Sequence, residues 1–121
     1  MGFKKVFSFA GWSPWRYNTA VIAQNGTVST AIEIGGAKHI GLVMPSAWDT
    51  ATLGVQVSHD GTTYQTLYDD AGIAVTIQAA ASRSIGINVA ALGLAPFQFM
   101  KLVASAAQTT AARSIVVVAK G

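Results

Sequence analysis

Apolar side chains alternate with small or polar ones along most of this sequence. Successive side chains of a strand point to opposite faces, so the alternation predicts half-buried β-strands. The residues that it assigns to one face of each strand are Val28, Thr30, Ile32 and Ile34; Ile40, Leu42 and Met44; Leu53, Val55 and Val57; Ile73, Val75 and Ile77; and Ile85, Ile87 and Val89. Two later stretches, "FQFMKLVA" and "SIVVVAK", are apolar on both faces, which is typical of central strands covered on both sides. Helix is expected only as single turns in "PSAWDTATL" and "NVAALGLAPF".

Turn signals separate these stretches. The pairs Asn25-Gly26 and Asp60-Gly61 suit two-residue hairpin turns, in which both central residues have positive φ. Pro45 ends a strand, and "DAG" at 70–72 forms a third turn. About eight to ten short strands spaced in this way predict an all-β fold, a single antiparallel jelly-roll-like β-sandwich. We assign residues 18–121 to the sandwich and residues 1–17 to an N-terminal arm or first strand.

The stretch "SHDGTTYQTLYDDAG" holds Asp60, Asp69 and Asp70, three of the five acidic residues. At ~3.3 Å per residue, the strand between the two turns places Asp60 and Asp69 up to about 30 Å apart. We therefore interpret these aspartates as turn formers whose carboxylates bond nearby backbone. The alternative is a calcium ion held at Asp69 and Asp70 with backbone carbonyls, although no EF-hand spacing is present.

The sequence contains no recognisable catalytic or ligand-binding motif. There is no cysteine, and His39 and His59 lack a second histidine at metal-ligand spacing. Glu33 is the only glutamate, and neither a nucleophile elbow nor a phosphate-binding or dinucleotide-binding loop is present. We expect a non-enzymatic protein with no catalytic residue, no cofactor and no resident metal.

The small number of charges restricts the partners. Charged residues make up 11% of the chain, against about 25% in an ordinary soluble domain. The eight basic residues are scattered, which argues against nucleic acid, and no apolar run approaches the ~20 residues of a membrane span. A surface with so little charge is expected to be covered by other subunits. We therefore predict a homo-oligomer, with a trimer as the first expectation.

Aromatic residues concentrate near the N-terminus. Residues 1–17 contain six of the eleven aromatics, and aromatic and arginine side chains commonly anchor interfaces. The candidate partner-binding residues are Phe3, Phe7, Trp12, Trp15, Arg16 and Tyr17. In the alternative interpretation, "FKKVFSF" is the first sandwich strand, and a strand followed by a "GWSPWRY" anchor combines the two. The third tryptophan, Trp48, either packs at the rim of the core or stacks against a sugar ring.

One phrase in the middle of the chain resembles a known family. An apolar strand ends in Pro, Ala-Trp follows, and after an alternating strand comes Ser-x-Asp-Gly-x-x-(aromatic)-x-x-Leu-Tyr-Asp. The matching residues are Pro45, Ala47, Trp48, Ser58, Asp60, Gly61, Tyr64, Leu67, Tyr68 and Asp69. With the closing "QTTAARSIVVV", residues 40–92 and 97–121 resemble small β-sandwich structural proteins in the virions of tailed bacteriophages.

The resemblance implies a function and a location. Proteins of this family decorate or cement the capsid, or form part of a neck, tail or fibre. The expected location is therefore the virion, and the expected partners are further copies of the chain and the major capsid protein or another virion protein. Similar Ser-x-Asp-Gly hairpins occur in carbohydrate-binding sandwiches, so a carbohydrate-binding module that stacks sugar on Trp48 is the alternative function.

Overall fold

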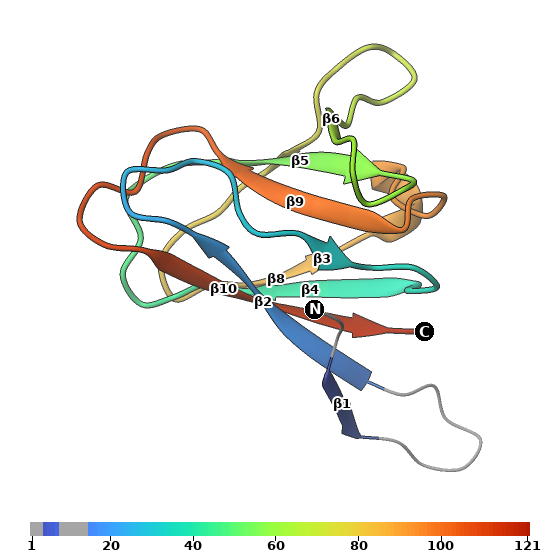
Figure 1. The fold of residues 1–121 in the computed structure, drawn as a ribbon, viewed down its shortest axis with the longest axis horizontal. Coiled ribbons are helices and arrows are strands. Elements are labelled where there is room, and N and C mark those ends of the chain that lie inside the picture. Colours follow the sequence, from blue (N-terminus) through green and yellow to red (C-terminus); the bar gives the residue numbers. More distant parts are fainter. Residues whose placement is uncertain (1–3, 8–14) are drawn as a thin grey trace.

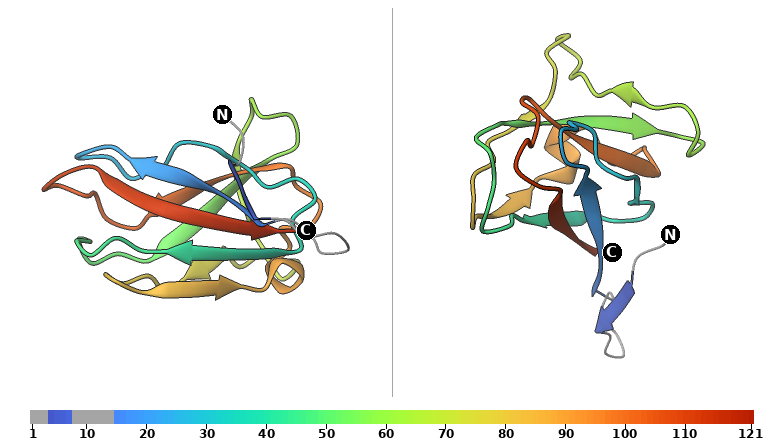
Figure 2. Two further views of the ribbon diagram at one scale, coloured as in Figure 1. Left: turned by 90° about the horizontal axis from the view of Figure 1, so that it is seen from below. Right: turned by 60° about the vertical axis from the view of Figure 1, so that its left-hand side comes forward.

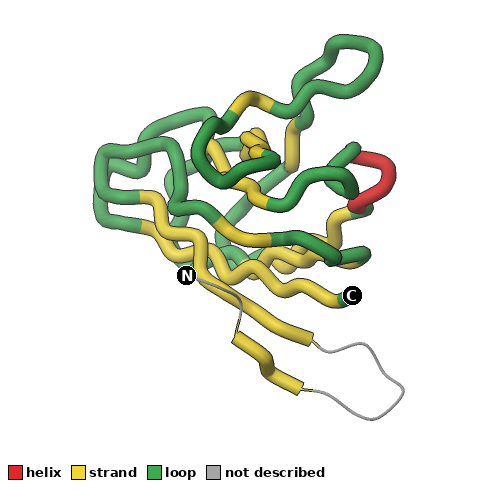
Figure 3. Tube along the Cα trace, turned by 45° about the vertical axis from the view of Figure 1, so that its right-hand side comes forward, coloured by secondary structure: helices red, strands yellow, loops and turns green. Residues whose placement is uncertain are grey.

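A computed structural model describes residues 4–7, as a strand whose side chains are not described, and residues 15–121. The strands and the helix are, in chain order, β1 (Lys4–Phe7), β2 (Trp15–Ile22), β3 (Ile32–Glu33), β4 (His39–Val43), β5 (Leu53–Ser58), β6 (Gln65–Thr66), β7 (Thr76–Ile77), β8 (Ser84–Ile87), α1 (Val89–Leu92), β9 (Phe99–Ala104) and β10 (Arg113–Lys120). They form two layers of antiparallel strands that enclose one core (Figures 1 and 3). The predicted all-β sandwich is confirmed.

The strand order is that of a jelly roll. One sheet, here called the outer sheet, has the order β1-β2-β10-β4-β8, and the second sheet has the order β3-β9-β5-β6, with β7 also paired to β5. β6 and β7 both pair with β5 and can be counted as one interrupted strand. Successive strands then alternate between the two sheets from β2 to β5 and again from β8 to β10, which is the pattern of two Greek keys. The strands β9 and β10 are central, as predicted, but only one face of each is fully buried.

Alternation identified the core wherever a strand stays within one sheet. Ile40 and Leu42 of β4 are buried, as are Leu53, Val55 and Val57 of β5. The buried apolar side chains of the two sheets form one core between the layers. The sequence-based face assignment for β4 and β5 is therefore confirmed.

The prediction of a single strand face across 28–34 is wrong. Ile32 and Ile34 are buried, but Val28 is 42% exposed and Ser29 is buried in its place. The chain crosses here from the outer sheet to the second sheet, because Ser29 bridges to Ile22 while Val28 bridges to Val103. The Ser29 hydroxyl accepts a hydrogen bond from the Leu102 amide, which satisfies the buried serine and shifts the alternation by one residue.

Ile73 is also placed wrongly by alternation, since it is 65% exposed. It lies in a hairpin that closes with a bridge between Tyr68 and Ala74 and projects beyond β6 (Figure 1). After the hairpin the chain leads into β7, and Val75 and Ile77 are buried as predicted. A short alternating run that spans a turn therefore carries an apolar residue away from the core.

The turns lie where the sequence predicted, but two of them have a different conformation. Of the pair Asn25-Gly26 only Asn25 has positive φ, at 67°, and of the pair Asp60-Gly61 only Gly61 does, at 79°. Neither is therefore the two-residue turn that was predicted. The third turn has Gly72 at φ 81°. The one helix is a single turn that Asn88 caps by accepting from the Ala91 amide, and among the described residues no helix is long and apolar enough to cross a membrane.

Candidate docking surface and the polar network at the loop end

The N-terminal segment enters the outer sheet. β1 pairs antiparallel with β2, with an irregularity in register between Lys5 and Phe7. Phe3 and Trp12 lie outside the described residues, and Phe7 is described only as a backbone position of β1. Since β2 begins at Trp15, the expected boundary after residue 17 falls inside a strand. The described part of the segment is consistent with the first-strand alternative.

Trp15, Arg16 and Tyr17 belong to β2 and alternate between its faces. The Lys120 ammonium lies 5.0 Å from the centre of the Trp15 ring, a cation–π contact. Arg16 points to the other side of the sheet and donates from Nη2 to the Gly35 carbonyl at 3.0 Å. Tyr17 is 38% exposed on the same face as Trp15. The structure therefore brings Trp15 and Tyr17 together on the outer face and uses Arg16 to hold the turn before β4.

Figure 2, left, shows β2, β10, β4 and β8 side by side, and the face of this sheet turned away from the second sheet is here called the outer face. Directly paired residues of neighbouring strands share a face. One row across β2, β10, β4 and β8 is Tyr17, Val118, Gly41 and Gly86, and the next is Thr19, Val116, Val43 and Ser84. A third row holds Trp15, Lys120 and His39 at one end of the face. No acidic side chain lies in these rows, and Tyr17 and Val43 are among the exposed large hydrophobic residues.

Two of the three aspartates of the 58–72 stretch, Asp60 and Asp69, hold loops as predicted. The Asp60 carboxylate accepts from the amides of Thr62, at 2.8 Å, and Thr63, at 3.0 Å, and from the Ser58 hydroxyl. These hydrogen bonds, the two amides first, lower the pKa of Asp60 to about 2. Asp69 accepts in the same way from the amides of Ala71 and Ile73.

The metal alternative gains no support from the geometry. Within residues 15–121 no three histidine or acidic side chains come together in a way that could hold an ion. His39 is exposed on β4, on the face opposite Ile40 and Leu42, as the alternation predicted. His59 is exposed in the loop after β5. These histidines belong to different sheets.

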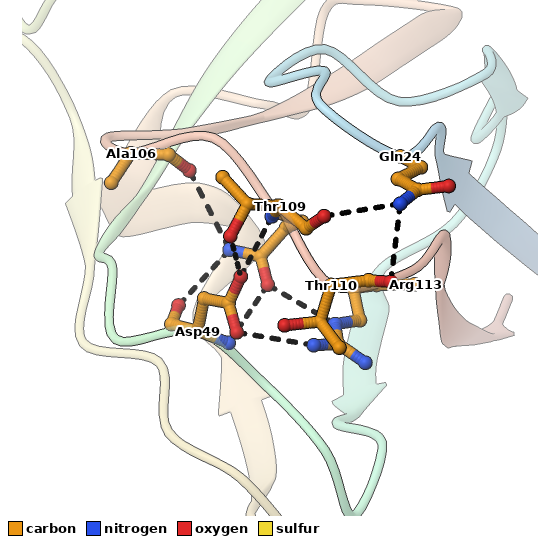
Figure 4. A network of polar contacts seen from close by, with 7 residues as sticks. Gln24, Asp49, Ala106, Thr109, Thr110 and Arg113 are labelled. Atoms are coloured by element: carbon orange, nitrogen blue, oxygen red, sulfur yellow. Dashed lines mark hydrogen bonds and ion pairs between the residues drawn. The ribbon is translucent and has the colours of Figure 1, made fainter.

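A polar network joins three loops at one end of the sandwich, here called the loop end (Figure 4). They are the loop after β2, the loop after β4 and the loop between β9 and β10. The centre of the network is Gln108, whose side chain is fully buried. The Gln108 amide oxygen accepts from the Asp49 amide at 2.8 Å and from Arg113 Nε at 3.3 Å, and its Nε2 donates to the Asp49 carbonyl at 3.0 Å. Arg113 Nη2 lies 3.1 Å from Asp49 Oδ1 in an ion pair. The network fixes the loop after β4 to the loop between β9 and β10.

Further bonds extend the network to the loop after β2. The Thr109 amide donates to Asp49 Oδ2 at 2.7 Å, and Gln24 donates to the carbonyls of Thr109 and Thr110. The bond from Thr109, opposed by desolvation and supported by Arg113, holds the pKa of Asp49 below its usual value. No local pattern in the sequence indicates this network, because Asp49 and Arg113 are 64 positions apart. The available signal was the closing "QTTAAR" motif of the family resemblance, which supplies Gln108, Thr109 and Arg113.

Trp48 lies beside the network and packs partly buried against the core. Its indole Nε1 donates to the Ala51 carbonyl at 3.2 Å. One face and the polar atom of the ring are therefore already engaged, as rim packing predicts. Sugar stacking on Trp48 stays a prediction.

The fold defines the chain as an antiparallel jelly-roll sandwich. A solved structure with a similar fold is that of the SPBc2 prophage-derived protein YomS, with a TM-score of 0.53 over 96% of this chain and 98% of that one. The two sequences are 5% identical, so the likeness shows the fold alone. No family model and no curated protein matches the chain.

Proposed function

We propose that the protein is a non-enzymatic structural component of a tailed-phage particle, most specifically a capsid-decorating or cementing subunit. The observation that carries the proposal is the outer face of the β1-β2-β10-β4-β8 sheet. Across β2, β10, β4 and β8, two adjacent rows there are built from Tyr, Thr, Val, Gly and Ser, without an ionisable group other than the tyrosine, and β1 adds Lys4 opposite Tyr17 at the edge. A face of this kind suits burial against another subunit, because few charges have to be desolvated.

Two further observations support the proposal. The sequence phrase from Pro45 to Asp69 resembles virion structural proteins, and a prophage-derived protein has a similar fold over nearly the whole chain. The polar network at the loop end is suited to a scaffold, because its groups are committed to bonds within the chain. We further propose that the working unit is a homo-oligomer, with a trimer as the first expectation.

The first test is the composition of purified particles of the phage that encodes the chain. Quantitative mass spectrometry should find the protein in the particles, in many copies relative to the major capsid protein. Protein found in infected-cell lysate but missing from purified particles contradicts the proposal. A few copies per particle would instead indicate a neck, tail or fibre component.

The second test places a charge on the proposed interface. Val43 and Val28 are both 42% exposed, but Val43 lies on the outer face and Val28 bridges to β9 of the other sheet. Val43→Lys should abolish incorporation into particles, because a buried lysine in the contact lacks a partner. Val28→Lys is the matched control and should be incorporated normally. If both variants are incorporated equally, the outer face is not the docking surface.

A further inference from the structure

A trough lined by both polar and apolar residues lies beside the exposed Tyr68. Two hollows meet there, with volumes of about 390 Å³ and about 370 Å³, and both are bounded by Leu67, Tyr68 and Phe97. The first extends along the loop that carries His59 and along β6, and the second extends over α1 and the turn that carries Asp70. The volumes lie at the lower end of those that ligand sites occupy. Tyr68 is 57% exposed and lines both hollows.

The segments that form the trough are each fixed by hydrogen bonds within the chain. Asp60 holds the loop after β5, Asp69 holds the turn at 69–73, and Asn88 caps α1. The Asp69 amide also donates to the Ile73 carbonyl at 2.9 Å, which closes the hairpin behind Tyr68. The trough is therefore formed before any ligand arrives, and little ordering is needed on binding.

The polar side chains around Tyr68 have unused hydrogen-bonding capacity. Among the hydrogen bonds of residues 15–121, none involves the side chain of His59, Gln65, Tyr68 or Asp70. Together these groups offer an imidazole, an amide, a phenol and a carboxylate, hence both donors and acceptors. His59 and Gln65 line the first hollow, Asp70 lines the second and Tyr68 lines both, in contrast to Asp49 and Gln108, whose side chains bond within the chain.

Charge narrows the class of ligand. No lysine or arginine lines either hollow, while Asp69 and Asp70 line the second. An anionic ligand such as a phosphate would meet carboxylates and no fixed cation. A purely apolar ligand would cover His59, Gln65 and Asp70 without pairing them, which is unfavourable. A pyranose fits both requirements, because it presents C–H groups on its face and hydroxyl groups around its edge.

We propose that the trough is a binding site for neutral saccharides, with Tyr68 as the stacking platform and His59, Gln65 and Asp70 as hydrogen-bonding partners for ring hydroxyls. The site is distinct from Trp48 and does not depend on the chain being a virion component. Because the hollows are shallow, a single site should bind with a dissociation constant of about 1 mM or weaker. Many copies held on one surface would bind a polymeric glycan far more tightly.

The test is a titration of the ¹⁵N-labelled protein, followed by amide resonances, with two neutral trisaccharides, maltotriose and triacetylchitotriose. At least one should shift the resonances of Tyr68, Gly93 and Phe97, with saturation approached at about 20 mM. Tyr68→Ser should weaken binding at least tenfold, whereas Tyr68→Phe keeps the platform and should retain most of it. Ile73→Ser is the matched control, since Ile73 is exposed on the same hairpin but lines neither hollow.

Three outcomes overturn the proposal. The first is no shift with either trisaccharide at about 20 mM, and the second is a shift that Tyr68→Ser leaves unchanged. The third is stronger binding of glucose 6-phosphate than of the neutral sugars, which would assign the trough to anions. If dilution of the protein alone moves the Tyr68 and Ile73 resonances and sugar does not, the hairpin is a protein contact instead. None of these results depends on whether the chain is found in particles.

Discussion

Replacing Gln108 tests whether the polar network holds the loop end of the sandwich. Leucine has a similar volume, so Gln108→Leu removes the amide without opening a large cavity. It leaves the Asp49 amide, the Asp49 carbonyl and Arg113 Nε without the partners they have at 2.8, 3.0 and 3.3 Å. Each buried group that loses its partner costs about 1–3 kcal/mol. Because Asp49 is only partly buried, we take the lower end for each of the three groups and expect a loss of about 3 kcal/mol in the free energy of unfolding.

A loss of this size is easily measured. Single domains have an unfolding free energy of about 5–15 kcal/mol, and for a chain of this length about 3 kcal/mol lowers the midpoint of thermal unfolding by about 12 °C. Circular dichroism on heating and urea titration should give consistent values if unfolding is two-state. Gln24→Leu is the control, because Gln24 is exposed and bonds to the same loop, and it should cost less than about 1 kcal/mol.

The isosteric change Gln108→Glu separates shape from bonding. It keeps the oxygen that accepts from Asp49 and Arg113, but its second oxygen faces the Asp49 carbonyl and can donate only when the carboxyl is protonated. The variant's deficit in unfolding free energy should therefore shrink as the pH falls toward about 4, the range in which a glutamate binds its proton. If Gln108→Leu is within about 1 kcal/mol of the wild type, the network does not stabilise the fold and the reasoning is refuted.

Three further predictions concern loops and the N-terminal segment. Asp60→Asn keeps an acceptor for the two loop amides and should cost little at neutral pH. Since the folded pKa of about 2 lies below the ordinary 3.8, wild-type stability should fall as the pH drops from 4 to 2, and the variant should lose that part of the pH dependence in acid-unfolding curves. Gly61→Val should lower the melting temperature clearly, because φ is 79° and a Cβ would lie 3.2 Å from the Phe99 ring; an unchanged melt would show that the loop adapts. A chain that starts at Asn18 loses three β2–β10 register pairs, including Trp15 with Lys120. It should keep β-type circular dichroism but melt at a lower temperature and fail to join particles or oligomers. Complete unfolding of this shortened chain would show that residues 1–17 belong to the core.

The sequence predicted most of the fold, because the interior of each strand follows a simple rule. Ile40 and Leu42 alternate with exposed neighbours since β4 lies in one sheet for its whole length. The rule fails at Val28 and Ser29, where the chain crosses between sheets and a hydrogen bond to the Leu102 amide decides which residue is buried. Dipeptide signals gave the position of a turn but not its dihedral angles. Asn25 adopts positive φ in a turn that is closed by the Gly26 amide bonding to the Ala23 carbonyl.

The candidate sites were less accessible from the sequence, for a physical reason. Aromatic content drew attention to residues 1–17 and to Trp48, but composition does not say which ring is exposed. Tyr68 is more exposed than Tyr17, although both lie in alternating stretches. The difference arises because a hairpin closes directly after Tyr68, held by the Asp69 carboxylate, and no strand covers it. Such an effect depends on tertiary structure and has no period along the chain.

In a chain with so few charges, the polar groups that remain show where contacts with other molecules should form. At the loop end, Asp49, Gln108 and Arg113 bond to one another and to backbone, so that end is built for stability. The outer face of the sheet carries hardly any charge over two rows of β2, β10, β4 and β8, which suits a contact with another subunit. At the Tyr68 trough, the side chains of His59, Gln65 and Asp70 form no hydrogen bond within residues 15–121, which suits a hydroxyl-rich ligand. A protein bound to a particle through the outer face would keep that trough accessible, because the hairpin projects from the opposite side of the sandwich (Figures 1 and 2).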